Sequence, residues 1–170
     1  MKLIQQDNFF PNLNFILPEI KKIKLYNLEE FNKLHHEKGN WPGYRSLPID
    51  QTNPSLYLYI NHLMREKKLI PKGKYSISTF LHLRLKEDDK KDWIHKDNND
   101  FSTLIYLSNS NPESGTYLYD ENKNIVNDIK FVQNRFVMYD GGYNHMGYGH
   151  HGSSIEDGRL TLNLFIKRIS

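Results

Sequence analysis

Two residues with metal-binding chemistry stand two positions apart in the segment Trp93–Asp97, which reads WIHKD. On an extended backbone, residues i and i+2 point to the same face, so His95 and Asp97 direct an imidazole and a carboxylate to one point. A later strand that brings His145 there would complete a face of two histidines and one carboxylate. That ligand set leaves about three positions of an octahedral ion open, which is typical of non-haem Fe(II) centres that activate oxygen.

The His-x-Asp pair is a weak signal by itself. With 8 His and 20 Asp and Glu in 170 residues, about one His-x-acid motif is expected by chance. The pair gains meaning only from the residues that follow it at a suitable distance, and from the elements that hold those residues in place.

The composition is that of a globular protein rather than a disordered one. Of the 170 residues, 38% are hydrophobic and 25% are charged, which suggests a single domain over residues 1–170 with one core. The formal net charge is +3, and no long basic run exists, which counts against a nucleic-acid partner. The sequence has no Cys, so disulfides and thiolate metal sites are excluded.

No targeting signal is recognisable in the sequence. A stretch of about 18 apolar residues is missing, and the N-terminus lacks the pattern of a signal peptide. The absence of Cys is compatible with a reducing compartment. The expectation is therefore a cytoplasmic protein without a membrane partner.

Short strands and two helices are expected in the N-terminal part of the chain. Met1–Lys24 contains short apolar groups broken by Pro11 and Pro18, which favours short strands or an irregular segment because proline stops helices. Asn27–Lys38 opens with an Asn cap and a Glu three residues later, which predicts a short helix. Ser55–Leu69 has its apolar residues in one stripe, which predicts a second helix.

A loop, Gly39–Pro54, lies between the two expected helices. It contains the sequence WPGYRS, and proline and glycine are the strongest loop signals. Trp41, Tyr44 and Arg45 are large side chains for a loop. They could line a cleft, but packing against the rest of the chain is the favoured interpretation.

From residue 73 onward the pattern becomes that of short strands. Their spacing and the turn residues between them predict a sandwich or jelly roll. The fold class expected is therefore mainly β with N-terminal helices: residues 1–72 hold the first strands and helices, and residues 73–170 form the β core. Strands are expected at Tyr75–Leu85, Phe101–Leu107, Gly115–Asp120, Ile125–Val132, Arg135–Asp140 and Arg159–Ile169, with a glycine-rich loop at Gly141–Gly158.

Along the last expected strand, polar or aromatic residues alternate strictly with aliphatic residues. Arg159, Thr161, Asn163 and Phe165 point one way, and the apolar residues between them point the other. An Arg, a Thr and an Asn on one face are unusual for the wall of a core, and they suit a polar barrel interior. The alternative is a face exposed to solvent, with Arg159 as a charge at the start of the strand.

Taken together, these pieces resemble a known family. Tyr75–Arg168 is similar to the double-stranded β-helix core of the 2-oxoglutarate- and Fe(II)-dependent dioxygenases, in particular the prolyl-4-hydroxylase-like group. The resemblance implies a jelly-roll, cupin-like core flanked by two helices. It rests on the order of HKD at 95–97, TLIYLS at 103–108, SGTYLYD at 114–120, RFVMYDGGYNH at 135–145 and RLTLNLF at 159–165.

The resemblance assigns the metal ligands. His95, Asp97 and His145 match the residues that bind the catalytic iron. His150 and His151 are further candidates for the second imidazole. The family places that histidine a short way after the RFVMYD-type strand, which favours His145, whereas His150 stands nine residues before the arginine of the last strand, a spacing that the family also uses.

The cosubstrate residues also follow from the resemblance. Arg159 matches the basic residue that pairs with the far carboxylate of 2-oxoglutarate, a task that suits the planar fork of arginine. Tyr106 stands where the family often has a tyrosine that donates to the same carboxylate, and Thr161 shares the face of Arg159 and would assist. His82 faces the same interior and is expected to be a packed histidine.

The implied cofactors are Fe(II), 2-oxoglutarate and O2, and the implied reaction couples decarboxylation of 2-oxoglutarate to succinate with hydroxylation of a C–H bond. The substrate stays open between a prolyl or other protein side chain and a free amino acid or small metabolite. Nucleic acids are disfavoured, because dealkylases of this superfamily carry a second arginine where this sequence has Phe165. The WPGYRS loop and Gly141–Gly158 are the candidates for substrate contact.

Two other classes compete with the oxygenase. One is a non-catalytic, cupin-like jelly roll that binds a ligand or a partner. The other is a hydrolytic Zn or Mn site built from the same three ligands, which leaves Arg159 without a role. The joint presence of the two histidines, the carboxylate, Arg159 and Tyr106 favours the oxygenase.

Overall fold

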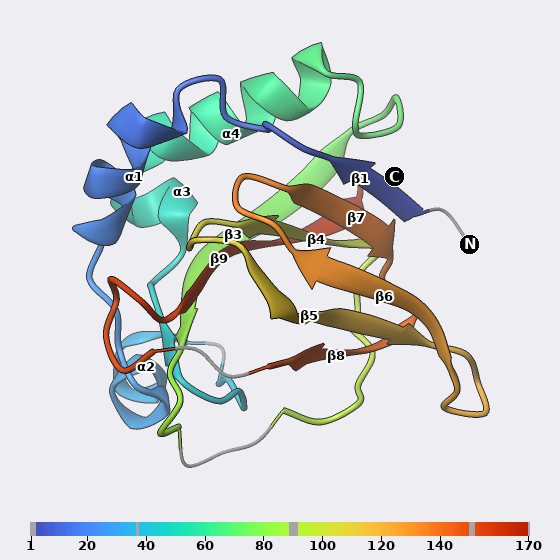
Figure 1. Ribbon diagram of the computed structural model, residues 1–170. Coiled ribbons are helices and arrows are strands. Elements are labelled where there is room, and N and C mark those ends of the chain that lie inside the picture. Colours follow the sequence, from blue (N-terminus) through green and yellow to red (C-terminus); the bar gives the residue numbers. More distant parts are fainter. Residues whose placement is uncertain (1–2, 37, 89–91, 150–151, 170) are drawn as a thin grey trace.

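Two antiparallel sheets form the body of the computed structural model, which describes residues 3–36, 38–88, 92–149 and 152–169 (Figure 1). The larger sheet has the strand order β1-β7-β4-β9-β3-β2, and the smaller has the order β6-β5-β8. The strands are β1 (Leu3–Gln6), β2 (Tyr44–Arg45), β3 (Tyr75–Arg84), β4 (Phe101–Tyr106), β5 (Asn111–Tyr119), β6 (Ile125–Phe131), β7 (Phe136–Asp140), β8 (Asn144–Tyr148) and β9 (Arg159–Arg168). The helices are α1 (Leu13–Lys21), α2 (Leu28–Leu34), α3 (Ile49–Thr52) and α4 (Pro54–Glu66).

The strands have their two faces in different environments. Helices α1 and α4 lie over one face of the six-stranded sheet, and the three-stranded sheet lies on the opposite side (Figure 1). On β9, Leu160, Leu162, Leu164 and Ile166 are fully buried in the core shared with the helices. Arg159 and Thr161 are buried on the other face, so the interpretation as an interior polar face is confirmed and the solvent-exposed alternative is wrong.

The mainly β architecture agrees with the expectation, and so do most of the strands. The capping box predicted at the start of α2 is present: Glu30 N donates to Asn27 Oδ1 at 2.9 Å, and Asn27 N donates to Glu30 Oε2 at 3.1 Å. Helix α4 occupies most of the second expected helix, with Leu56, Ile60 and Leu63 buried.

Helix α1 corrects the expectation for the first 24 residues. Pro18 lies inside this helix, where proline normally removes one hydrogen bond and disfavours the helical conformation. The segment is nevertheless helical, and Leu13 and Ile20 are buried at either end of it. Burial of these two side chains against the sheet therefore outweighs the local propensity.

Three further elements lie where loops were expected. Strand β2 and helix α3 fall within Gly39–Pro54, and strand β8 falls within Gly141–Gly158. Strand β8 pairs with β5 in register Leu118 to His145, so non-local pairing rather than local sequence makes it a strand. The expected pair of helices is thus extended to four in the described part of the chain.

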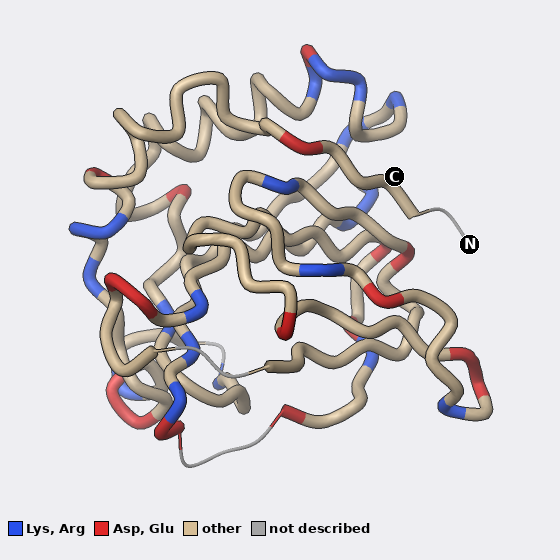
Figure 2. Tube along the Cα trace, viewed as in Figure 1, with Lys and Arg blue, Asp and Glu red and all other residues tan. Residues whose placement is uncertain are grey.

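Charged residues of both signs alternate over the tube in Figure 2, which agrees with a solvated surface. None of the helices within the described ranges is long and apolar enough to cross a membrane.

Asn134 fastens the N-terminal segment to the turn between β6 and β7. Its Nδ2 donates to Phe10 O at 2.9 Å, and its Oδ1 accepts from Phe10 N at 2.8 Å. A further bond runs from Phe9 N to Asn134 O at 3.0 Å. The backbone of Asn134 has φ +63°, a left-handed conformation that Asn tolerates better than most residues.

We predict that N134A destabilises the protein by about 3–7 kcal/mol. The change leaves the buried N–H and C=O of Phe10 without partners, at about 1–3 kcal/mol each, and it puts alanine in a left-handed conformation. N134G loses the same bonds without that strain, so its loss should be about 1 kcal/mol smaller. Urea unfolding at neutral pH measures both variants, and an N134A protein as stable as wild type contradicts the assignment.

Candidate metal centre

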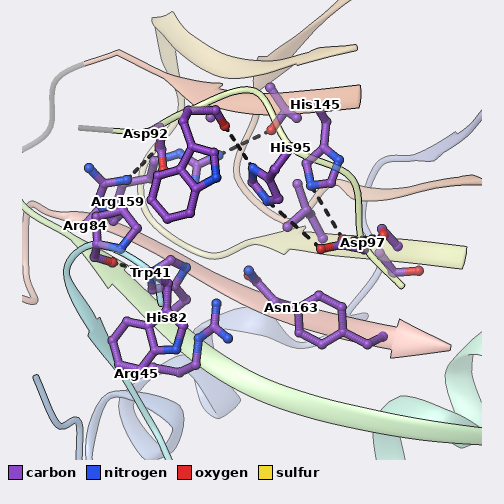
Figure 3. A pocket seen from close by; sticks show the side chains of 18 of the residues that line it. Trp41, Arg45, His82, Arg84, Asp92, His95, Asp97, His145, Arg159 and Asn163 are labelled. Atoms are coloured by element: carbon purple, nitrogen blue, oxygen red, sulfur yellow. Dashed lines mark hydrogen bonds and ion pairs between the residues drawn. The ribbon is translucent and has the colours of Figure 1, made fainter. Parts of the chain in front are cut away.

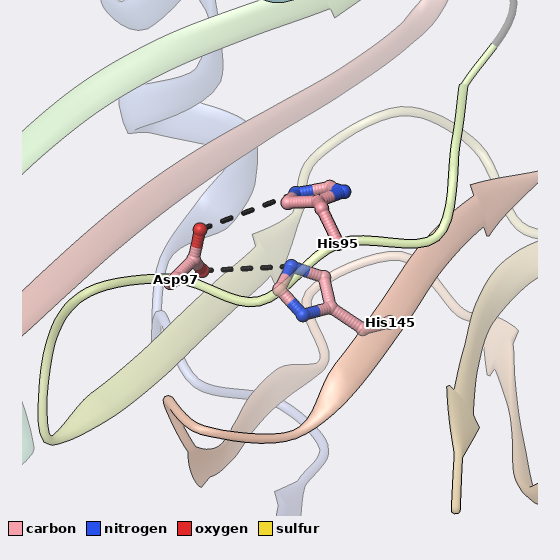
Figure 4. A group of neighbouring side chains, drawn as sticks. All are labelled: His95, Asp97 and His145. Carbon is pink, nitrogen blue, oxygen red and sulfur yellow. Dashed lines mark ion pairs between the residues drawn. The ribbon is translucent and has the colours of Figure 1, made fainter. Parts of the chain in front are cut away.

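The two histidines are held opposite each other by the backbone. His95 N donates to His145 O at 3.1 Å, and His145 N donates to His95 O at 2.8 Å. This exchange of two bonds is the hydrogen-bonded pair of an antiparallel ladder, here an isolated bridge between the segment before β4 and strand β8. Asp97 N continues the pairing with a bond to Gly141 O at 3.2 Å. Figure 4 shows both rings turned toward Asp97.

Each imidazole is fixed through its Nδ1 atom. His95 Nδ1 lies 2.8 Å from Trp93 O, and His145 Nδ1 lies 3.0 Å from Tyr143 O. A carbonyl oxygen only accepts, so Nδ1 carries the hydrogen in both rings and Nε2 of the neutral ring keeps its lone pair. A ligand histidine is commonly oriented by this kind of bond. Both Nε2 atoms are therefore prepared to bind a metal.

The three candidate ligand atoms converge on one point. They lie within 4.8 Å of one another, with Asp97 Oδ1 4.0 Å from His95 Nε2 and Asp97 Oδ2 3.5 Å from His145 Nε2. Ligands about 2.0–2.2 Å from a shared ion lie at most about 4.4 Å apart, so the spacing fits a single ion after a small contraction. Two imidazoles and one carboxylate suit a divalent first-row metal.

Burial and hydrogen bonding prepare the ligands electrostatically. Burial lowers the pKa of His145, against the opposing effect of Asp97, so the ring is neutral at physiological pH and available to a metal. Ser102 is buried on β4, and its hydroxyl donates to Asp97 Oδ2 at 2.5 Å. Asn99 Nδ2 donates in turn to Ser102 Oγ at 3.1 Å. The carboxylate is thereby held in one orientation.

We predict that S102A weakens binding of Mn(II) about 10- to 100-fold, the usual effect of removing a residue that orients a ligand. The change leaves Asp97 free to turn while removing no ligand atom. Titration of Mn(II) followed by electron paramagnetic resonance measures the affinity. S55A, an exposed serine on α4, is the matched control, and equal affinities in the two variants contradict the role of Ser102.

A cavity of about 200 Å³ surrounds the candidate ligands and lies between the two sheets (Figure 3). Arg159, the first residue of β9, lines it and is buried. Its Nη2 donates to Gly115 O and to Thr116 Oγ1, both at 3.3 Å, while Nε is buried without a partner in the described residues. The guanidinium lies over the rings of Phe131 at 5.5 Å and Tyr106 at 5.7 Å.

Gly147 leaves room for this arginine. A Cβ at position 147 would lie 2.9 Å from Asp92 Oδ2 and 3.5 Å from Arg159 Nη2, so a larger residue would press against both groups. Asp92 itself is paired with Arg84, whose Nη1 lies 2.6 Å from Asp92 Oδ2. Within the described residues Arg159 thus keeps an unpaired Nε and a partly open fork in a low-dielectric setting, a combination that suits an anion.

The other two predicted cosubstrate residues lie near Arg159 but do not line the cavity. Tyr106 is fully buried, and its hydroxyl donates to Thr116 Oγ1 at 2.8 Å. Thr161 donates to Asn163 Oδ1 at 2.7 Å. Thr116, which sequence reasoning did not single out, stands between Tyr106 and Arg159. Its only signal was its place in the strand SGTYLYD.

Residues of the WPGYRS loop also reach the cavity. Trp41 and Arg45 line it, although packing was the favoured interpretation, and Trp41 packs as well, against Phe31 at 5.2 Å between ring centroids. Tyr44 is exposed. His82 is a packed histidine, as expected: its Nε2 lies 2.8 Å from Pro42 O, and burial lowers its pKa well below the usual value, so it stays neutral.

His145 is the histidine that joins His95 and Asp97 among the described residues. His150 and His151, the alternative ligands, lie outside the described residues. Strand β8, within Gly141–Gly158, carries His145 as the expected candidate ligand, and contact of this segment with substrate stays a prediction.

No protein-family model matches the sequence, and no curated protein matches it. Solved structures do match. A prolyl-4-hydroxylase from Pseudomonas putida is 14% identical, with a TM-score of 0.59, over 99% of this chain and 93% of that one. A 2OG-Fe(II) oxygenase family oxidoreductase from Burkholderia pseudomallei is 12% identical, with a TM-score of 0.61, over 98% and 84%.

HygX from Streptomyces hygroscopicus, solved with nickel, 2-oxoglutarate and hygromycin B bound, is 10% identical, with a TM-score of 0.65, over 97% of this chain and 82% of that one. At such identities the likeness establishes the fold. The predicted resemblance to prolyl-4-hydroxylases and other 2OG-Fe(II) oxygenases is therefore confirmed at the level of the fold.

Proposed function

We propose that the chain is an Fe(II)- and 2-oxoglutarate-dependent dioxygenase that hydroxylates a C–H bond, and that residues 1–170 form one such domain whose two facing sheets are a double-stranded β-helix. One observation carries the proposal. His95 and His145 direct free Nε2 atoms at Asp97, in a cavity that also holds a buried arginine, Arg159, with an unpaired Nε. A plain ligand-binding jelly roll requires neither feature, and a hydrolytic metal site leaves the arginine unexplained.

In this function His95, Asp97 and His145 hold the iron. When bound, Fe(II) supplies the oxidising chemistry together with 2-oxoglutarate and O2, which yields succinate and carbon dioxide. Arg159 receives the far carboxylate of 2-oxoglutarate through its planar fork. Thr116 fixes the guanidinium, and Tyr106 orients Thr116 through its own hydroxyl, so we assign Tyr106 a supporting role one residue removed from the cosubstrate.

The substrate is proposed from two classes: a prolyl or other side chain of a protein, or a free amino acid or small metabolite. HygX was solved with hygromycin B bound, and the Pseudomonas putida protein is a prolyl-4-hydroxylase, so the likeness in fold does not choose between the two classes. We assign cosubstrate binding to the two sheets, which this chain shares with these proteins in fold. The choice of substrate depends on the residues that this chain carries around the cavity.

We predict that anaerobic addition of Fe(II) and 2-oxoglutarate produces the weak visible absorption band of this class, and that H95A, D97A and H145A each abolish it. Each variant removes one of the three ligands. H62A is the matched control, because His62 lies on α4 with 70% of its side chain exposed, and it should keep the band. Absence of the band in wild type, together with no formation of succinate under air, favours a non-catalytic binding protein.

The role of Arg159 is tested separately. We predict that R159M raises the Kd for 2-oxoglutarate about 10- to 100-fold in the Mn(II)-loaded protein, because it removes a charge-assisted pair in a buried site. The Kd of R159K should lie between those of wild type and R159M, since lysine keeps the charge without the planar fork of arginine. Calorimetry measures the affinity, and Mn(II) affinity within about two-fold of wild type shows that the ligands are intact. An unchanged Kd in R159M contradicts the assignment.

A further inference from the structure

We propose that Arg45 binds a carboxylate of the primary substrate, and that the aromatic residues around it hold the apolar part of that substrate. The inference rests on the proposed function for the reaction, while the binding step is tested without turnover. It narrows the substrate to a small carboxylic acid or a free amino acid, as opposed to a residue in the interior of a peptide chain.

Arg45 is placed rigidly at the wall of the cavity. It lies on the two-residue strand β2, in register with His82 of β3. On its other side, its backbone exchanges two hydrogen bonds of 2.9 Å with Tyr26. With pairing on both sides, the position is fixed by the sheet and not by a mobile loop.

The side chain of Arg45 is surrounded by aromatic rings and forms no ion pair with any carboxylate in the described part of the chain. Its guanidinium lies 4.8 Å from the ring of Trp41, 5.5 Å from Phe80 and 5.9 Å from Phe165. Its Nε is buried without a hydrogen-bond partner in the described residues. Burial lowers the pKa of Arg45 to about 10, against the opposing charge of Asp97, so the group remains a cation at neutral pH.

Other arginines of the chain show what is missing at Arg45. Arg84 pairs with Asp88 and Asp92, each at 2.6 Å, and Arg135 pairs with Asp7 at 2.6 Å. A partly buried cation whose Nε is fully buried is costly without a carboxylate partner, and Asp97, whose charge acts on Arg45, is the proposed iron ligand. An anion supplied from outside would resolve this imbalance.

The cosubstrate does not account for Arg45. Arg159 begins β9, and its guanidinium contacts Gly115, Thr116 and Phe131 of β5 and β6. The guanidinium of Arg45 has a different set of neighbours, the rings of Trp41, Phe80 and Phe165. Figure 3 shows the two arginines entering the cavity from different elements. The second cation therefore needs a second anion.

A groove of about 480 Å³ leads from Arg45 to the surface and shares Trp41, Arg45, Asp97 and Phe165 with the cavity. Lys38 and Lys167 also line this groove. Among the described residues that line it, Asp97 is the one carboxylate. The groove therefore carries a positive charge, with aromatic walls. This combination suits an anion with an apolar body.

The test uses the Mn(II)-loaded protein with saturating 2-oxoglutarate under argon, so that binding is measured without turnover. Calorimetry compares matched pairs of probes: phenylacetate with phenylacetamide, N-acetylproline with N-acetylprolinamide, and N-acetylleucine with N-acetylleucinamide. For at least one pair, the carboxylate should bind wild type at least about ten-fold more tightly than its amide, and R45M should reduce this ratio to near one. R45K, which keeps the charge, should retain part of the preference.

A purely structural role of Arg45 predicts a different outcome. Packing lost in R45M would weaken carboxylate and amide alike and leave their ratio unchanged. Equal binding within every pair in wild type, or no binding of any probe, overturns the proposal. So does an increase in the Kd for 2-oxoglutarate in R45M comparable to that in R159M, which would make Arg45 a cosubstrate residue.

Two features keep the outcome interpretable. Should R45M fail to fold, as judged by circular dichroism, the ratio in R45K and the carboxylate–amide comparison in wild type still decide the question. Failure of the proposed function would show itself as loss of the Fe(II)–2-oxoglutarate band, independently of the probe ratios. A peptide that binds only through its C-terminal carboxylate would support Arg45 as the receptor, and a peptide amide binding equally well would contradict it.

Discussion

The exchange of hydrogen bonds between His95 and His145 is the interaction on which the candidate site depends. The two residues are fifty positions apart in the chain, yet the bridge sets their Cα atoms opposite each other. The bond from each Nδ1 to a carbonyl two residues earlier then fixes the ring, and Ser102 fixes the carboxylate. Each ligand is thus positioned by a separate hydrogen bond, so the group is preorganised before any metal binds.

This arrangement explains how much of the site could be predicted. His95 and Asp97 share a face because of a local rule for extended chains, which needs no knowledge of the fold. His145 required a non-local pairing, and the glycine-rich sequence around it gave no local strand signal, so β8 was expected to be a loop. The two faces of β9 could be predicted from the sequence because one apolar face stays buried along the whole strand.

The remaining misses have the same cause, since tertiary packing decides them. Pro18 predicts the end of a helix, but the burial of Leu13 and Ile20 keeps α1 helical. Arg45 stands on a strand of two residues, too short for any periodic pattern, and its partial burial follows from Trp41, Phe80 and Phe165 packing around it. Thr116 had no signal beyond its place in SGTYLYD. The surroundings of these residues come mainly from neighbours that are distant in sequence.

The two sides of the cavity are built from different parts of the chain. The Arg159 side consists of β4, β5, β6 and β9, whose side chains contact one another directly. The Arg45 side depends in addition on Phe31 of α2 and on Trp41, which pack against Phe80 of β3. A change in the N-terminal segment can therefore alter the walls of the groove while leaving Arg159 in place. The fold shared with solved oxygenases at 10–14% identity is consistent with this division, because the two-sheet core can be kept while the covering segment diverges.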